Sequence, residues 1–421
     1  MTARPDTDAT SAPPRATTAP TSAPPKKPVT LPKPDSDFYR MHDILSDAER
    51  ATLAKVRAFM ETQVAPVINK YWLEDAFPFE LVAGIRDLKI TGAGYSGYGC
   101  AGGSTLFAGF LAMEMARIDC SIATFFGVTS GLAMGSIYLG GSEEQKQKWL
   151  PPMARLEKIG SFALTEPLVG SGTGGGLMTT ARRDGDTWVL NGQKKWIGNA
   201  TFGDVTIVWA RDVADNQVKG FIVENKTTPG FVAEKIQHKM ALRVVQNALI
   251  TLTDCRVPEA NRLQIDATFR DTARVLRMTR AYVGWEAVGC QMGAYENALA
   301  YAQTREQFGK PIASFQLVQD HLFRMISNIT ASLCLVVRLS QLQDEGKLKD
   351  EQASMAKAFC TVTMRETVGH ARELMGANGI LLDHNVGRFV ADSEALYSYE
   401  GTREMNTLIV GKAVSGFSAF V

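Results

Sequence analysis

The stretch that decides the fold runs Asp184-Gly185-Asp186-Thr187-Trp188-Val189-Leu190-Asn191-Gly192. Its centre is β-branched and aromatic, and a dipeptide typical of tight hairpin turns stands at each end. Similar runs follow at 205–209 and 220–223. The sequence from Gly160 to about residue 270 therefore predicts short strands that form a compact antiparallel barrel or sandwich.

Helical patterns flank this middle segment on both sides. Ser46 with Glu49, and Ser142 with Gln145, fit the capping box that starts a helix. In the C-terminal part, apolar residues at 322, 325, 329, 333 and 336 share one face of a helix that should end near Gly346. A further helix is expected over 350–374, before two glycines.

Helices, then strands, then helices indicate an α+β protein, because a doubly wound α/β sheet needs alternating strands and helices. We predict a disordered tail rich in Pro, Thr and Ala at 1–36, an N-terminal helical domain at 37–159, a middle β domain at 160–270 and a C-terminal helical domain at 271–421. The tail contains no apolar run typical of a signal peptide, and the C-terminal residues do not match a peroxisomal signal. A cytoplasmic location is therefore expected.

Composition excludes several classes of function. The chain carries 45 basic and 44 acidic side chains, so it has no global attraction to nucleic acid or to an anionic membrane. Its six cysteines lie far apart, without metal-ligand spacing, and are expected to be reduced; no metal site is predicted. The uncharged span 120–142 is long enough to cross a bilayer, but its hydroxyl residues and glycines favour a buried helix, and no integral membrane association is expected.

Two glycine-rich segments look like nucleotide-binding motifs. Gly97 to Gly102 fits GxGxxG, but a dinucleotide fold needs a second parallel strand after the next helix, and no such strand is predicted there. Gly170 to Gly176 lacks the GK[ST] of a P-loop, although its backbone amides can still face an anion. We therefore assign neither segment to a nicotinamide or nucleoside triphosphate.

The segment Tyr399-Glu400-Gly401-Thr402 closes the C-terminal helical region. A Glu held in a mostly apolar site can act as a general base, because burial raises its pKa and strips its hydration. Taken alone, Glu400 would more simply be a solvated residue of a connecting loop. Four other segments change that interpretation.

The five segments together, in their order and spacing, resemble the acyl-CoA dehydrogenase and acyl-CoA oxidase flavoproteins. They are residues 162–167 (FALTEP) with Gly170-Ser171, residues 191–199 (NGQKKWIGN), residues 305–312 (REQFGKPI) with Phe315-Gln316, residues 376–379 (GANG) and residues 399–402 (YEGT). The C-terminal residues 411–416 are most similar to glutaryl-CoA dehydrogenases and plant-type short-chain acyl-CoA oxidases.

The resemblance implies a C-terminal four-helix bundle, bound FAD and a homotetramer. It also implies that Glu400 removes the α-proton of an acyl-CoA thioester while the β-hydrogen leaves as hydride to flavin N5, which gives a trans-2-enoyl-CoA. The negative charge that develops on the thioester oxygen would be stabilised by the Glu400 backbone amide and a flavin ribityl hydroxyl. The electrons would pass to an electron-transfer flavoprotein, or to oxygen in an oxidase.

The same resemblance assigns binding residues. Those expected to contact the FAD of their own chain are Phe162, Leu164, Thr165, Gly170, Ser171, Trp196, Ile197, Gly198, Thr402 and Glu404. Those expected to reach the FAD of a neighbouring subunit are Arg305, Gln316, Glu373, Leu374, Met375, Gly376 and Ala377. Those matching acyl-CoA contacts are Ser171, Arg277, Arg280 and Gly401. From the residues alone, Trp196 could instead be a core side chain, Arg305 a helix-surface cation, and the other two arginines partners of helix carboxylates.

Some positions depart from the family pattern. Gly172 stands where Asp is common, and Gly198 replaces a Thr or Ser that bonds flavin N5, which leaves dehydrogenase versus oxidase open. Ala123 stands where glutaryl-CoA dehydrogenases use an Arg to bind the distal carboxylate, so an uncharged acyl chain is favoured. Thr279 occupies the position of the base in isovaleryl-type members, which leaves Glu400 without a rival.

The sequence thus predicts an FAD-dependent dehydrogenase of short- or medium-chain, uncharged acyl-CoA. The alternatives, in order, are an acyl-CoA oxidase that forms hydrogen peroxide, a glutaryl-CoA dehydrogenase, and a non-catalytic protein that binds flavin or acyl-CoA. A helical scaffold without a cofactor is a further class, since a fold does not guarantee chemistry.

Overall fold

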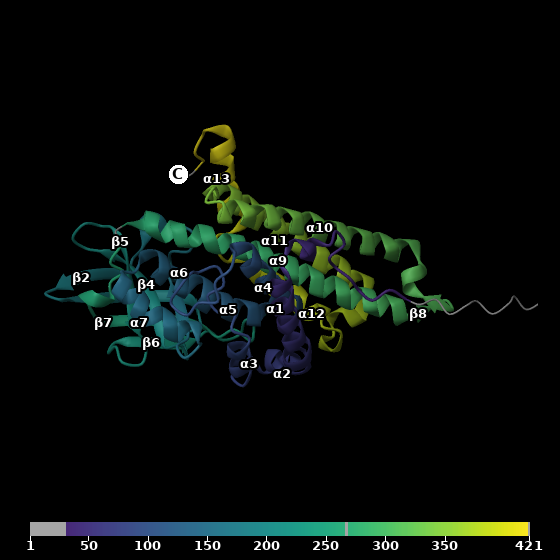
Figure 1. Cartoon of the computed structure of the whole chain (residues 1–421), viewed down its shortest axis with the longest axis horizontal. Helices are drawn as coiled ribbons and strands as arrows, with labels where there is room; N and C mark the ends of the chain where they lie inside the picture. Colours follow the sequence, from purple (N-terminus) through teal and green to yellow (C-terminus); the bar gives the residue numbers. More distant parts are fainter. Residues whose placement is uncertain (1–30, 266–267, 420–421) are drawn as a thin grey trace, which may run out of the picture. The chain divides into compact units, whose positions relative to one another are not determined.

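The computed structural model describes residues 31–265 and 268–419, and Figure 1 shows the arrangement of its elements. Met1–Lys33 and Pro34–Val421 form separate units, and the following concerns the second. The tail predicted at 1–36 lies almost wholly outside the described residues. Ser36 is buried and its hydroxyl donates to Glu296 at 2.5 Å, so packing begins just before residue 37.

The N-terminal part is helical, as predicted. Both capping boxes are present, with Ser46 at the start of α1 and Ser142 at the start of α7. The glycines at 97–102 lie in the loop before α4, whose cap is Ser104. The elements are η1 (Met41–Ile44), α1 (Asp47–Phe59), η2 (Met60–Val64), α2 (Ala65–Glu74), α3 (Leu81–Asp87), α4 (Thr105–Ile118), α5 (Cys120–Gly127), η3 (Val128–Ala133), α6 (Met134–Gly140) and α7 (Glu143–Ala154).

The uncharged span 120–142 forms α5, η3 and α6 in continuous succession. By length and composition this helix, Cys120–Gly140, could cross a membrane, and so could Gln316–Asp344. The most apolar window of the first is 72% buried inside the protein, which fits the buried helix expected from its hydroxyl residues, whereas that of the second is 39% buried.

The middle part forms a mixed sheet of seven strands in the order β1-β4-β2-β3-β7-β6, with β5 paired to β4. The decisive stretch 184–192 lies at the β2–β3 hairpin, where Asp184 pairs with Thr187. The predicted all-antiparallel pairing is wrong at two places, because β4 runs parallel to β1 and to β2. The strands are β1 (Gly160–Ala163), β2 (Thr180–Asp184), β3 (Thr187–Gly198), β4 (Val205–Asp212), β5 (Val218–Glu224), β6 (Phe231–Lys235) and β7 (Asn247–Pro258).

The C-terminal part is built from long helices. Helices α9 to α12 pack against one another as the expected four-helix bundle, and α9 also packs on α4. On α10 the predicted face is buried at Met325, Ile329, Leu333 and Val336. The helices are α9 (Phe269–Thr304), α10 (Gln316–Asp344), α11 (Asp350–Leu374), α12 (Val386–Ser398) and α13 (Arg403–Ser415).

Short elements complete the chain. Those of the middle part are α8 (Thr173–Gly176) and η4 (Glu259–Asn261), and those of the C-terminal part are β8 (Glu306–Gln307), β9 (Lys310–Pro311), η5 (Ile312–Ser314), η6 (Gly376–Ile380) and η7 (Leu382–His384).

Candidate active site

A cavity of about 710 Å³ lies where the strands of the middle part meet α9 and the connection between α12 and α13. Its wall combines segments that are far apart in the sequence. Of the residues predicted to bind cofactor or substrate, those that line it are Phe162, Leu164, Thr165, Gly170, Ser171, Trp196, Ile197, Gly198, Arg280, Glu400, Gly401 and Thr402. The structure therefore brings the predicted base and most of the predicted same-chain residues to one place.

Glu400 lies in the short connection between α12 and α13. Its φ is 55°, and that of Gly401 is 87°, so both residues are left-handed. This conformation is unfavourable for a residue with a side chain and tends to persist where the surrounding structure enforces it at functional sites. The side chain meets α9 there, and the Thr279 hydroxyl donates a hydrogen bond to Glu400 Oε2 at 3.2 Å.

A buried lysine supports this connection from α11. Lys357 is fully buried, and its Nζ donates to Tyr397 O at 2.7 Å and to Gly401 O at 2.8 Å. Burial lowers the pKa of Lys357 to about 7, while the Glu400 carboxylate opposes that shift. Because the two carbonyls flank Glu400 in the chain, Lys357 fixes the backbone that carries the predicted base.

The surroundings of Glu400 suit a general base. Burial raises the pKa of Glu400, while Arg280, the Thr279 hydroxyl and Lys357 act in the opposite direction. Arg280 Nε also donates to the backbone carbonyl of Glu400 at 3.4 Å. The carboxylate thus keeps more basicity than a solvated Glu, and nearby donors still allow it to be charged.

Trp196 presents a large apolar surface to the cavity. Its backbone is left-handed, with a φ of 67°, and 52% of the residue is exposed although Ile197 beside it is buried. The alternative that Trp196 is a core residue of the β domain is therefore wrong. A broad indole face in a cavity wall suits contact with another flat aromatic ring.

A buried ion pair fixes the loop that follows β1. Lys194 Nζ donates to Glu166 Oε1 at 2.8 Å and to Leu164 O at 2.9 Å, and both charged side chains are buried. Burial alone would raise the pKa of Glu166, but the Lys194 ammonium and further hydrogen bonds hold it below its usual value. The pair thereby ties the cavity residues Leu164 and Thr165 to strand β3.

Other predicted residues lie away from the cavity. Arg277 pairs with Asp350 at 3.3 Å, and Glu404 is exposed in the first turn of α13. Arg305 directly follows α9, roughly 39 Å beyond Thr279 at 1.5 Å per residue, so it cannot reach the cavity of its own chain. The remaining ones are Gln316, Glu373, Leu374, Met375, Gly376 and Ala377, of which Leu374 and Met375 are buried in the helical core. Their role toward the FAD of a neighbouring subunit stays a prediction.

The cations of the cavity wall are few. Among the described residues that line it, the Lys and Arg side chains are Lys239 and Arg280. Lys239 Nζ already donates to two backbone carbonyls and to Asn247 Oδ1, at 2.6 to 2.8 Å. Ala123, which the sequence predicts to replace an Arg of glutaryl-CoA dehydrogenases, is buried on α5.

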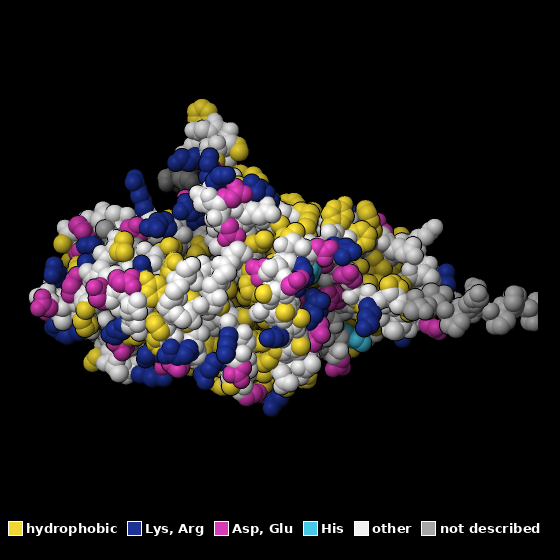
Figure 2. All heavy atoms as spheres, viewed as in Figure 1, with side chains coloured by type: hydrophobic (Ala, Val, Ile, Leu, Met, Phe, Trp, Pro, Cys, Tyr) yellow, Lys and Arg dark blue, Asp and Glu magenta, His cyan; other side chains and the backbone are white. Residues whose placement is uncertain are grey.

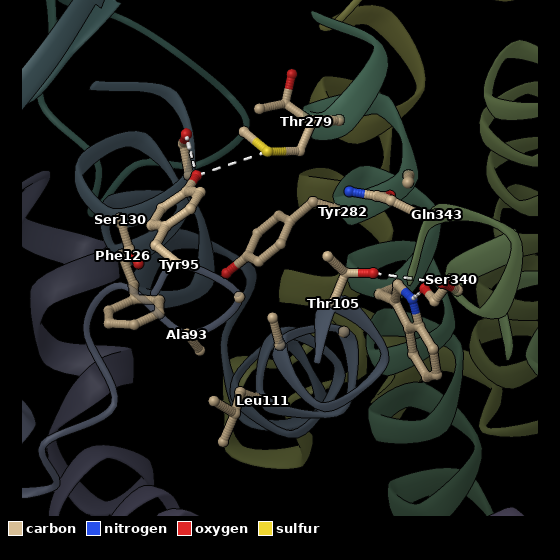
Figure 3. A pocket seen from close by; sticks show the side chains of 17 residues that line it. Ala93, Tyr95, Thr105, Leu111, Phe126, Ser130, Thr279, Tyr282, Ser340 and Gln343 are labelled. Atoms are coloured by element: carbon tan, nitrogen blue, oxygen red, sulfur yellow. Dashed lines mark hydrogen bonds between the residues drawn. The ribbon is translucent and has the colours of Figure 1, made fainter. Parts of the chain in front are cut away.

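Some polar wall residues were not predicted from the sequence, above all Glu286 and Tyr282 on α9. A second cavity of about 60 Å³ shares Thr279 and Tyr282 with the first. Figure 3 shows the Tyr282 hydroxyl pointing into this smaller cavity, and within the described part of the chain it has no hydrogen-bond partner. A charged residue inside the apolar run 281–288 was the signal that could have drawn attention to Glu286.

A group of possible metal ligands lies on α10 and α11, where His321, His370 and Glu373 have ligand atoms within 4.8 Å of one another. The two imidazole Nδ1 atoms are 3.1 Å apart. A hydrogen bond from one neutral ring to the other accounts for this contact.

Comparisons with known proteins agree with one another. The chain matches the family models of the acyl-CoA dehydrogenase N-terminal domain at 46–157, middle domain at 161–255 and C-terminal domain at 269–415. An acyl-CoA dehydrogenase of Bacillus subtilis (strain 168) is 32% identical over 366 residues, which cover 86% of this chain and 96% of the relative.

Two solved structures extend this similarity. A glutaryl-CoA dehydrogenase of Mycobacterium smegmatis in complex with FADH2 has a TM-score of 0.89 and 34% identity, and the match covers 93% of this chain and all of the other, 100%. The butyryl-CoA dehydrogenase of Megasphaera elsdenii has a TM-score of 0.84 and 30% identity, and the match covers 88% of this chain and 98% of the other.

Proposed function

Because the chain belongs to the acyl-CoA dehydrogenase family, we propose that it oxidises the Cα–Cβ bond of a short- or medium-chain, uncharged acyl-CoA to a trans-2-enoyl-CoA. Family membership confirms the predicted fold class and the assignment to oxidoreductases that act on acyl-CoA. One observation carries the proposal: the Glu400 carboxylate accepts a hydrogen bond from Thr279 in the wall of a cavity that Trp196 also lines.

The cavity fits FAD, the cofactor predicted from the sequence. Trp196 offers an exposed aromatic face, and the wall residues Leu164 and Thr165 are fixed beside it by the Lys194–Glu166 pair. A flat ring system would find an apolar surface and rigid backbone groups there. When bound, FAD accepts the β-hydrogen with its electron pair, which is chemistry that no side chain supplies.

The chain's own residues perform the proton transfer. Glu400 takes the α-proton of the thioester, and the carboxylic acid that forms is neutral. Thr279 orients the acceptor oxygen, while Lys357 holds the carbonyls on either side of Glu400. Because these contacts exist before substrate binds, little reorganisation is needed at the moment of reaction.

The lining of the cavity favours an uncharged acyl chain. A distal carboxylate would need a cation, but Lys239 already donates three hydrogen bonds and Ala123 supplies no charge. Leaving a buried carboxylate unpaired costs several kcal/mol, on the order of 3–5, so a dicarboxylic substrate such as glutaryl-CoA is disfavoured.

A second candidate is an acyl-CoA oxidase, and the observation that favours it is Gly198. This residue lines the cavity without a side chain that could donate to a flavin. A Cβ added at Gly198 would lie 3.3 Å from Val128 Cγ2, so a Thr or Ser there would need a shift of the Val128 side chain by a few tenths of an ångström. The leading proposal passes electrons to an electron-transfer flavoprotein; the oxidase would pass them to oxygen.

We also propose that the protein is a homotetramer. Large hydrophobic side chains of α10 remain exposed, with Leu317 at 80% and Phe323 at 67%, and Figure 2 shows hydrophobic side chains gathered over α10 and α11. Monomers rarely expose such contiguous patches. A second copy that covered them would bring the groups near Arg305 and Gly376 toward another subunit.

We also propose that the protein is located in the cytoplasm, as expected from its sequence.

The function can be tested with the purified, FAD-loaded protein under nitrogen. Butyryl-CoA and hexanoyl-CoA should bleach the flavin absorbance and yield the corresponding trans-2-enoyl-CoA, whereas glutaryl-CoA should not. Turnover with an artificial acceptor and little hydrogen peroxide in air would separate the dehydrogenase from the oxidase. Bleaching by glutaryl-CoA alone would overturn the proposed substrate class, and a colourless protein that cannot be loaded with FAD would overturn the function.

A further inference from the structure

We propose that Glu286 forms a subsite for a neutral hydrogen-bonding substituent, such as a hydroxyl group, carried by the acyl chain beyond its β-carbon. The proposal rests on the acyl-CoA dehydrogenase function above and narrows its substrate class. It starts from a buried carboxyl group that the proton transfer does not use.

One face of α9 forms a continuous strip of the cavity wall. Leu276, Thr279, Val283 and Glu286 all line the cavity, at the spacing of three and four residues that places side chains on the same side of a helix. Thr279 binds the Glu400 carboxylate and so marks the position of the α-carbon. Glu286 lies seven residues further, roughly 10 Å along the helix axis, so an acyl chain that follows this strip leads to it.

Glu286 is buried and accepts a hydrogen bond within the protein. It is 3% exposed, and its Oε2 accepts a hydrogen bond from the Tyr399 hydroxyl at 2.5 Å. Among the described residues, the Tyr399 hydroxyl is its hydrogen-bond partner, and Glu286 also lines the cavity. A ligand group that forms a further hydrogen bond to this carboxyl group would therefore be favoured over a plain alkyl chain.

The surroundings of Glu286 favour a neutral substituent over an ammonium group. Burial raises the pKa of Glu286 to about 8, the Tyr399 hydrogen bond opposes this, and the negative charge of Glu400 adds to it. Near neutral pH the carboxyl group is therefore mostly protonated and can both donate and accept. Because a mostly neutral carboxyl group provides no full countercharge, an ammonium group buried beside it would lack an ion-pair partner there.

The neighbouring hydroxyl of Tyr282 does not serve the same subsite. It points into the smaller cavity, as Figure 3 shows, and Glu286 is not among the residues that line that cavity. Glu286 and Tyr399 are thus the polar pair that faces the acyl chain.

The length of a suitable ligand follows from the geometry. A hydroxyl on carbon six lies five bonds from the α-carbon, or roughly 6 Å at about 1.2 Å per bond of an extended chain. A hydrogen bond of about 2.8 Å then spans most of the roughly 10 Å between Thr279 and Glu286 along α9. We therefore choose 6-hydroxyhexanoyl-CoA as the probe, with hexanoyl-CoA as the matched alkyl ligand and 6-aminohexanoyl-CoA as the cationic one.

The test compares kcat/KM for the three ligands in the wild-type holoenzyme, in Glu286→Gln and in Glu286→Leu. Wild type should prefer the hydroxyl ligand to the alkyl ligand by about tenfold or more, and Glu286→Gln should keep that ratio within about threefold. Glu286→Leu should abolish the preference and improve the use of hexanoyl-CoA. Calorimetric dissociation constants measured in a Glu400→Gln background should show the same order without turnover.

Three results would overturn the subsite. The first is a wild-type ratio near one, which is measured without any variant. The second is a cationic ligand that outperforms the hydroxyl ligand, and the third is an equal ratio in wild type and Glu286→Leu when both proteins retain flavin and melt normally. If none of the three ligands reduced the flavin, the proposed function itself would fail; reduction by hexanoyl-CoA without discrimination would remove only the role of Glu286.

Discussion

The Thr279 hydroxyl donates a hydrogen bond to the Glu400 carboxylate at 3.2 Å, from the middle of α9 to the connection between α12 and α13. The hydroxyl of one helix therefore orients the carboxylate of the proposed base, so α9 and the connection between α12 and α13 meet at this contact.

Replacing Thr279 with Val should shift the pH profile. Glu400 acts only when ionised, so kcat/KM should rise with pH through its pKa, which burial already raises. The Thr279 hydrogen bond favours the charged form, so its loss should move the acid limb upward by about one pH unit. Thr279→Ser, which keeps the hydroxyl, is the control. A Thr279→Val profile that coincides with wild type would show that this bond does not tune the base.

Lys357→Met should weaken catalysis and stability together. Two carbonyls that flank Glu400 would lose their buried donor, at a cost of about 1–3 kcal/mol. We expect a lower thermal midpoint and a fall in kcat that exceeds any change in KM, because the base rather than the binding surface is displaced. Lys347→Met is the control, since Lys347 is exposed and pairs with Glu345 at the surface. Equal behaviour of the two variants would contradict the supporting role.

Lys194→Met should release the cofactor. The substitution leaves the Glu166 carboxylate buried without its cation, which costs on the order of 3–5 kcal/mol and frees the loop after β1. Flavin content after gel filtration should drop well below one per chain. Adding Glu166→Gln should recover part of the loss, because no uncompensated charge remains. Full flavin retention in Lys194→Met would contradict a role of the Lys194–Glu166 ion pair in cofactor binding.

Phe323→Glu, combined with Leu317→Glu, should dissociate the assembly. Both side chains are exposed on α10, and a subunit that covered them would have to bury two charges. Sedimentation velocity should show a smaller species than wild type. Val213→Glu is the control, because Val213 is exposed beyond the end of β4, away from that face. An unchanged sedimentation coefficient would move the interface elsewhere.

Much of the fold could be predicted from local patterns in the sequence. The limits of α11 agree with the prediction from its periodicity and the glycines after it, and both capping boxes start helices where expected. These features depend on residues a few positions apart, so the sequence displays them directly. The parallel pairing of β4 with β1 and β2 depends on distant segments, and no local signal marks it.

The residues of the site also fall into two groups, those that sequence motifs predicted and those that only the packing reveals. Glu400 and Trp196 stand in motifs whose order and spacing could be compared with a family, and both line the cavity. Lys357 and Glu286 act through partners on other helices, and each looks like an isolated charge in an apolar run. Their roles follow from packing, which places Lys357 against the carbonyls of Tyr397 and Gly401, and Glu286 against Tyr399.

The most direct test of the account is anaerobic mixing of hexanoyl-CoA with FAD-loaded wild type, Glu400→Gln and the control Glu74→Gln. Wild type and Glu74→Gln should bleach at similar rates and form trans-2-hexenoyl-CoA, since Glu74 is exposed at the end of α2 and does not line the cavity. Glu400→Gln should bind flavin and ligand yet bleach more slowly by a factor of roughly 10²–10⁴, the usual contribution of a general base. Bleaching of Glu400→Gln within about threefold of wild type would contradict the assignment of Glu400 as the base.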